Sequence, residues 1–133
     1  RYFSNCKHCI LFGDFNARCG NLKDYTLMDD FLTEFYDLQN LQNEEDLIFR
    51  NFSLYNMPVN RKSVDHSTNH YGHQLIDLCK NNNMFMWNGR MFDDFTNPKL
   101  TCKNASTVDY FLSTSFVFEN IIDFKVEEFC SLY

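Results

Sequence analysis

The sequence predicts a small domain of the layered α/β or α+β class, in which helices and strands alternate along the chain. The chain has 133 residues, 44% of them hydrophobic and 17% aromatic, which is enough apolar mass for one core. Short apolar runs bounded by glycine or asparagine also alternate with segments whose apolar residues recur at helical spacing. We therefore expect one domain, or part of one.

The first half of the chain contains one predicted strand and one predicted helix. The strand is the apolar run Cys9–Phe12, which Gly13 closes. A short amphipathic helix is predicted over residues 28–35, where apolar side chains recur at helical spacing. The polar and irregular stretch 39–67 is predicted to be a long loop with at most short local elements.

The clearest predicted helix lies just after this loop. Thr68 or Asn69 can cap its start, and the asparagine run 81–83 ends it. A strand is then predicted over Met84–Trp87, followed by a turn at Asn88-Gly89.

The last third predicts a hairpin and one more helix. Its two strands would be Lys99–Lys103 and Thr107–Leu112, because each run is short and bounded by polar residues. One or two helical turns are predicted over 116–121, and a final strand over 122–126.

Charge and cysteine usage narrow the function classes. The net charge is -6 and both halves are acidic, so tight non-specific binding of nucleic acid by this segment alone is not expected. Of six cysteines, only Cys6 and Cys9 have zinc-like spacing, and no second pair follows. Reduced thiols and an intracellular protein are expected. No run approaches the roughly 20 apolar residues of a membrane span.

The sharpest local signal is Gly13-Asp14-Phe15-Asn16, which places a carboxylate and a carboxamide just beyond the first strand. If the chain stays extended there, Asp14 and Asn16 point to the same side. A carboxylate can activate water or bind Mg²⁺, and an amide can donate to a phosphoryl oxygen. The alternative is that both residues are turn formers that bond their own backbone.

A second carboxylate, Asp109, lies inside the apolar run 106–112. A carboxylate in such a run needs a partner, because an unpaired buried charge is costly. A histidine is one suitable partner, and backbone amides or an arginine are the alternatives. The sequence does not favour any of its four histidines, which lie at positions 8, 66, 70 and 73.

These motifs, taken in order, resemble the endonuclease/exonuclease/phosphatase superfamily. The similarity runs over nearly the whole chain, through the segments Ile10–Arg18, Arg61–Asp65, Asn69–Cys79, Asn88–Arg90 and Ser106–Leu112. The middle segments are most similar to the apurinic-endonuclease-like domains of LINE-type (non-LTR) retrotransposons.

The resemblance implies a fold of four layers, in which two facing mixed β-sheets are flanked by helices. The chain would be the C-terminal half of that sandwich. We expect the N-terminal half, with the principal metal ligands, and the terminal Ser-Asp-His motif to lie outside the chain. The sheet face that would meet the second sheet is then expected to be exposed.

The resemblance also implies a Mg²⁺- or Mn²⁺-dependent phosphodiesterase and assigns roles to individual residues. Asp14 would position or deprotonate the attacking water, and it is the one metal ligand expected in this chain. Asn16 would stabilise the pentacovalent phosphorus. Asp109 would orient a catalytic histidine, while Ser106 and Thr101 would contact the substrate phosphate.

The implied substrate is DNA, with RNA as the alternative, and a reverse transcriptase domain is expected downstream in the same frame. We expect no membrane partner, and a nuclear location if the chain belongs to a functional retroelement. The isolated chain is expected to be inactive. The other hypotheses are a non-catalytic remnant or binding module, a phosphatase or RNA nuclease of the same superfamily, and an unrelated α/β domain.

Overall fold

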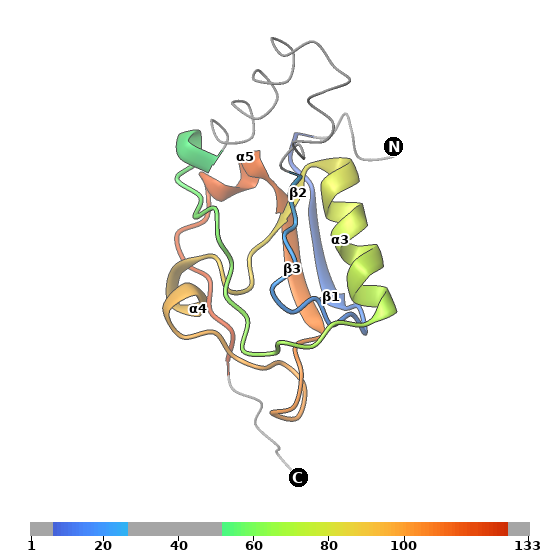
Figure 1. Ribbon diagram of the computed structural model, residues 1–133. Helices are drawn as coiled ribbons and strands as arrows, with labels where there is room; N and C mark the ends of the chain where they lie inside the picture. Colours follow the sequence, from blue (N-terminus) through green and yellow to red (C-terminus); the bar gives the residue numbers. More distant parts are fainter. Residues whose placement is uncertain (1–6, 27–51, 128–133) are drawn as a thin grey trace.

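The computed structural model describes residues 7–26 and 52–127 (Figure 1). These residues form a small α+β domain around a three-stranded antiparallel sheet with the strand order β1-β3-β2. The strands are β1 (Ile10–Asp14), β2 (Met84–Met86) and β3 (Asp109–Thr114). The predicted α+β class is therefore confirmed.

The central strand β3 begins and ends two residues later than predicted. Its last residues are polar, yet both are buried with their hydroxyl groups hydrogen-bonded. Ser113 accepts from the indole nitrogen of Trp87 at 2.7 Å, and Thr114 donates to the carbonyl of Lys7 at 2.7 Å. A satisfied hydroxyl can be buried in a strand at little cost. The predicted strand therefore ends too early, because the polar residues Ser113 and Thr114 do not look like strand residues in the sequence.

The helix α3 (His70–Asn82) confirms the predicted helix and its caps. The side chain of Asn69 accepts from Gly72 N at 2.8 Å and so caps the start. Asn83 takes a left-handed conformation with φ 50° and ends the helix. Leu75, Ile76 and Cys79 are buried on the face that packs against the sheet.

The remaining helices are short: α4 (Phe92–Thr96) and α5 (Ser115–Phe118). The element α5 confirms a helical turn in the predicted segment 116–121. Within the predicted long loop, residues 52–54 form a helical turn and residues 55–67 are irregular. The predicted helix over 28–35 lies outside the described residues.

Two predicted strands are wrong. The segment 99–103 does not pair as a strand, because Thr101 N and Cys102 N both donate to Ser106 O and close a tight turn. Lys103 and Asn104 occupy that turn in left-handed conformations, with φ 48° and 54°. The segment 122–126 is also irregular. The ring of its Phe124 packs against the rings of Trp87 and Phe111.

The predicted strand over Met84–Trp87 is one residue too long. Trp87 N still donates to Phe111 O, but Trp87 O accepts from Arg90 N at 2.9 Å and turns the chain away. This turn confirms the one predicted at Asn88-Gly89, and Gly89 occupies it with φ 70°.

The core lies on both faces of the sheet. On one face, α3 packs over a cluster that includes Met84, Met86, Tyr110 and Leu112. On the other face lies an aromatic cluster that includes Trp87 and Phe118, whose rings stack at 4.3 Å. Figure 1 shows α3 on one side of the sheet, with α4 and α5 on the other.

A buried ion pair lies near the aromatic cluster. Arg90 is fully buried and donates to both carboxylate oxygens of Asp24 at 2.7 and 2.8 Å. It also donates to the carbonyls of Met86 and Pro58. Burial alone would raise the pKa of Asp24, but the hydrogen bonds and charge of Arg90 outweigh it and lower that pKa. The pair thus joins three segments that the sequence separates.

The aromatic cluster does not extend over the whole sheet. On the edge strand β1, Ile10 is 46% exposed and Phe12 is 75% exposed. The strand register places Phe12 opposite Phe111, and the two rings stack at 6.1 Å. Residues 7–26 and 52–127 contain no second sheet that would cover this face. None of the described helices has the length and apolar character needed to cross a bilayer.

Candidate functional site

The two carboxylates that the sequence singled out meet at one end of the sheet. The register of β1 and β3 places Asp14 directly opposite Asp109. Cβ atoms of directly opposed residues lie about 4.5–5.5 Å apart in antiparallel strands. Like charges in such a pair weaken the sheet. The pair is therefore unfavourable for the fold, which makes this end of the sheet a candidate site.

Asp14 starts a turn. One of its carboxylate oxygens, Oδ1, accepts from Asn16 N at 2.8 Å, and Asn16 takes a left-handed conformation with φ 50°. The chain therefore does not stay extended through Asn16, because this local bond turns it just after the strand. Asp14 is thus a turn former, as the alternative interpretation held. It is exposed, so its carboxylate can also meet a ligand.

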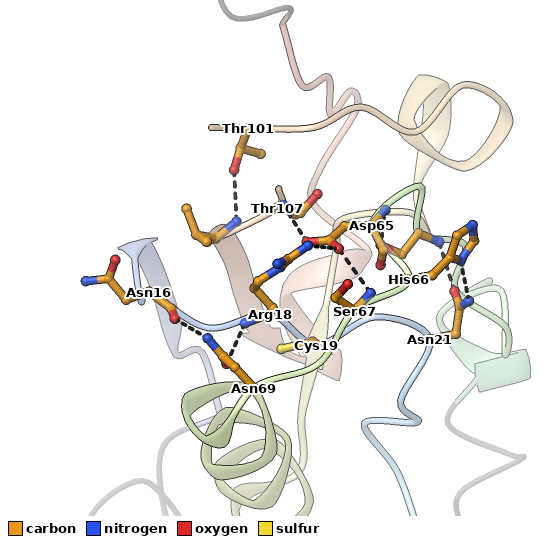
Figure 2. A network of polar contacts seen from close by, with 12 residues as sticks. Asn16, Arg18, Cys19, Asn21, Asp65, His66, Ser67, Asn69, Thr101 and Thr107 are labelled. Atoms are coloured by element: carbon orange, nitrogen blue, oxygen red, sulfur yellow. Dashed lines mark hydrogen bonds and ion pairs between the residues drawn. The ribbon is translucent and has the colours of Figure 1, made fainter. Parts of the chain in front are cut away.

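The turn sets the direction of Asn16. Figure 2 shows the Asn16 side chain pointing outward, away from Arg18 and Asn69. Its backbone carbonyl points the other way and accepts from Asn69 Nδ2 at 2.9 Å. The backbone of Asn16 is therefore held by the protein, while its exposed carboxamide can donate to a bound group.

Thr101 supports the start of β3. Its hydroxyl oxygen accepts from Val108 N and from Asp109 N, each at 3.1 Å. A hydroxyl that accepts twice still carries one proton to donate. Thr101 therefore fixes the backbone at Asp109, and its hydroxyl proton can donate a hydrogen bond to a phosphate oxygen.

Ser106 lies beside Thr101 in the turn that precedes β3. The two residues are joined by a hydrogen bond from Thr101 N to Ser106 O at 3.0 Å. Ser106 is half-buried and does not line the groove that holds Thr101 and Asp109. The structure thus brings Thr101 to Asp109, and it places Ser106 one turn away.

An open groove of about 490 Å³ runs along the sheet beside Asp109. Phe12 and Phe111 of the sheet line it together with the segment 124–127. Among the described residues that line it, Lys125 is the only cation, and it pairs with Glu127 at 2.8 Å. The groove therefore leads from an apolar surface to the acidic end of the sheet.

A second polar network is centred on Asp65. Asp65 is buried and receives two hydrogen bonds from Arg18, at 2.7 and 2.9 Å. It also accepts from Ser67 N and from Thr107 N at 3.1 and 3.0 Å (Figure 2). This one carboxylate thus joins the segment after β1 to the segment before β3.

The environment of Asp65 keeps it charged. The hydrogen bonds from Arg18 lower its pKa to about 2, and the backbone bonds from Thr107 and Ser67 act in the same direction against the effect of burial. In the sequence, Arg18 and Asp65 are only the last residues of two segments that resemble the superfamily, Ile10–Arg18 and Arg61–Asp65. Their pairing could not be foreseen, because 47 positions separate them.

The described residues do not complete a metal site. They contain no cluster of three or more His, Cys, Asp or Glu side chains that could hold a metal ion. Mg²⁺ takes octahedral oxygen coordination, to which Asp14, the one ligand that the resemblance assigns to this chain, would add a single carboxylate. The ion implied by the resemblance would need further ligands from outside the described residues. Cys6 of the zinc-like pair lies outside the described residues.

No histidine was preferred from the sequence as a partner for Asp109. In the structure, His66 Nδ1 lies 3.2 Å from Asn21 Nδ2, at the opposite side of the Asp65 network from Asn16 (Figure 2). His66 is therefore engaged with Asn21 rather than with Asp109.

Comparisons with protein-family models, with curated proteins and with solved structures found no match to this chain.

Proposed function

We propose that the chain forms the C-terminal half of an endonuclease/exonuclease/phosphatase domain and contributes Asp14, Asn16 and Asp109 to a phosphodiesterase site. The observation that carries the proposal is the placement of Asp14 opposite Asp109 at one end of the sheet. Asn16 lies in the turn that Asp14 starts, and its side chain is exposed. The pairing brings together two carboxylates that lie far apart in the sequence, which supports the proposal.

Each of the three side chains has a distinct chemical task in this proposal. Asp14 accepts a proton from the attacking water or positions it. Asn16 donates to the phosphoryl oxygen on which charge develops. Asp109 orients a histidine supplied from outside the described residues, and Thr101 and Ser106 contact the phosphate. When bound, Mg²⁺ or Mn²⁺ would polarise the phosphoryl group.

The substrate and setting follow from the resemblance of the middle segments to retrotransposon endonucleases. The proposed activity is the nicking of DNA in the nucleus by a protein that also carries a reverse transcriptase. RNA hydrolysis or phosphatase activity are the alternatives within the superfamily. The net charge of the chain is -6, so we propose that other parts of the protein bind the DNA backbone.

The exposed face of β1 supports the finer fold proposal, a sandwich of two facing sheets. Ile10 and Phe12 are 46% and 75% exposed, although they lie on an otherwise apolar sheet face. A second sheet would bury both side chains at the usual spacing of about 10 Å between packed sheets.

A second candidate is a non-catalytic remnant or binding module. Two observations favour it: Asp14 is engaged in a local turn, and no metal cluster forms among residues 7–26 and 52–127. In this case the carboxylate pair would have no role in cleavage.

A nicking assay separates the two candidates. The protein encoded by the complete reading frame would be incubated with supercoiled plasmid and Mg²⁺, as wild type, Asp14→Ala and Asp77→Ala. Asp77 is an exposed residue of α3 and serves as a charge-matched control. Asp14→Ala should lower the rate by roughly 100-fold or more, while Asp77→Ala matches wild type. Equal rates for wild type and Asp14→Ala would leave the remnant as the better account.

A further inference from the structure

Asn69 lies beside the turn that carries Asn16, and its side chain contacts this turn directly. Its Oδ1 accepts from Arg18 N at 2.9 Å, and its Nδ2 donates to Asn16 O at 2.9 Å. Its backbone N–H donates to Arg18 O at 3.1 Å. Three hydrogen bonds therefore run from one residue to the backbone of residues 16–18.

The contacts of Asn69 lie where the sheet pairing stops. The last sheet-like bond after β1 joins Phe15 N to Val108 O at 3.0 Å. Beyond it, Asn16 has φ 50°, a left-handed conformation that asparagine tolerates better than most side-chain-bearing residues. The contacts of Asn69 begin at this point, so they take over where the sheet ends.

The support is anchored to a rigid element. The same Oδ1 of Asn69 accepts from Gly72 N at 2.8 Å and caps α3, which is 13 residues long. Gly72 lets the helix lie against the turn, because a Cβ there would be 1.9 Å from Arg18 O. The position of the Asn16 backbone is thereby tied to the helix.

Capping α3 does not by itself require asparagine at position 69. Serine and aspartate cap helices about as well as asparagine. Neither can donate to Asn16 O, because neither carries a side-chain N–H and a serine hydroxyl is too short to reach. Of the three residue types, only asparagine can cap α3 and also donate a side-chain N–H to Asn16 O.

We propose that Asn69 is a positioning residue that directs the carboxamide of Asn16 toward the substrate phosphate. This role rests on the proposed phosphodiesterase function. Asn69 itself does not touch the substrate, because its polar atoms are engaged with residues 16, 18 and 72.

The test measures plasmid nicking by the protein of the complete reading frame, as wild type, Asn69→Ser, Asn69→Asp and Asn16→Ala. Both Asn69 variants keep the cap, and they differ in charge. We expect each to lower Tm by no more than about 5 °C. Each should lower kcat by roughly 10- to 100-fold and change KM by less than about threefold. A loss in Asn69→Asp alone would reflect the added charge and overturn the proposal.

The double variant Asn16→Ala/Asn69→Ser tests whether Asn69 acts through Asn16. Its kcat should equal that of Asn16→Ala, because a positioning residue has nothing left to position. Losses that multiply would show an independent role and overturn the proposal. If Asn16→Ala is slow but Asn69→Ser has the wild-type kcat, only the role of Asn69 fails. If Asn16→Ala itself has the wild-type kcat, the proposed function of Asn16 fails with it.

Discussion

At the scale of single residues, Asp65 illustrates how one buried carboxylate fixes two chain segments at the site. It accepts two hydrogen bonds from Arg18, and it accepts the backbone amides of Ser67 and Thr107. Charge-assisted hydrogen bonds of this kind are about twice as strong as neutral ones. The loop before α3 therefore holds together the ends of β1 and β3 that carry Asp14 and Asp109.

Replacing Asp65 should destabilise the fold. In Asp65→Asn the carboxylate is lost, Arg18 has no paired charge, and an amide nitrogen meets backbone donors. We expect a loss of about 2 kcal/mol in the free energy of unfolding at pH 7. Urea unfolding measures it, with Asp77→Asn on the exposed face of α3 as a control that should change by less than about 0.5 kcal/mol. A loss as small as that of the control would contradict the structural role of Asp65.

The lowered pKa of Asp65 predicts how the stability of the fold depends on pH. The folded-state pKa of Asp65 is about 2, below its ordinary value of 3.8. Its contribution to stability is therefore complete above about pH 4 and disappears as the pH falls toward 2. Between these pH values, the wild type should lose more stability than Asp65→Asn, as urea midpoints at successive pH values would reveal. Parallel profiles for the two proteins would show that Asp65 is not the titrating group.

The sequence points to candidate site residues but not to their hydrogen-bond partners. Asp14 and Asp109 stand out in the sequence because each carboxylate adjoins an apolar strand. The hydrogen bonds of Asn69 and Asp65 cannot be predicted, because a bond between residues 53 or 42 positions apart leaves no periodic signal. The turn at Asn16 was an open alternative until the bond from its backbone to Asp14 was known.

At the scale of elements, α3 could be predicted because its signals are local: a cap at Asn69, a left-handed end at Asn83 and an apolar face between them. The segment 99–103 also carries a local signal, which predicts a strand. A strand forms only where a partner strand is available. Here the amides of Thr101 and Cys102 donate to Ser106 O instead, and the segment forms a turn. Local sequence alone cannot decide that competition.

The close approach of α3 to the turn after β1 predicts the effect of Gly72→Ala. In an ordinary helix this change adds stability, because alanine favours helices over glycine. Here the new Cβ would lie 1.9 Å from the backbone oxygen of Arg18, which cannot move without breaking its bond to Asn69. We expect a loss of about 2 kcal/mol or more, measured by thermal unfolding. Gln74→Ala, at an exposed position of the same helix, is the control, and a stabilised Gly72→Ala variant would refute this packing.

At the scale of the whole molecule, the sequence predicted the α+β class but not the extent of the fold. Alternation of helices and strands follows from composition and periodicity. The number of sheets that pack together depends on residues far apart in the chain. The described residues contain one sheet with an uncovered apolar edge, so the second sheet remains a proposal.

Phe12 tests that proposal. In the protein of the complete reading frame, Phe12→Ser should cost more than about 2 kcal/mol if a second sheet covers β1. Tyr71→Ser, at a 57% exposed aromatic residue of α3, is the matched control and should cost less than about 1 kcal/mol. Chemical denaturation provides the comparison. If both changes are equally mild, the face of β1 stays open in the complete protein and the two-sheet sandwich is wrong.

The central claim is that Asp14 and Asp109 belong to one catalytic site, and a double-mutant cycle on phosphodiester cleavage tests it most directly. Single-turnover nicking rates would be measured for wild type, Asp14→Ala, Asp109→Ala and the double variant, in the protein of the complete reading frame. Groups that act as a unit are strongly non-additive. We predict that each single change lowers the rate by roughly 100-fold or more and that the double variant is no slower than the slower single variant. A wild-type rate in either single variant, or losses that multiply in the double variant, would contradict the claim.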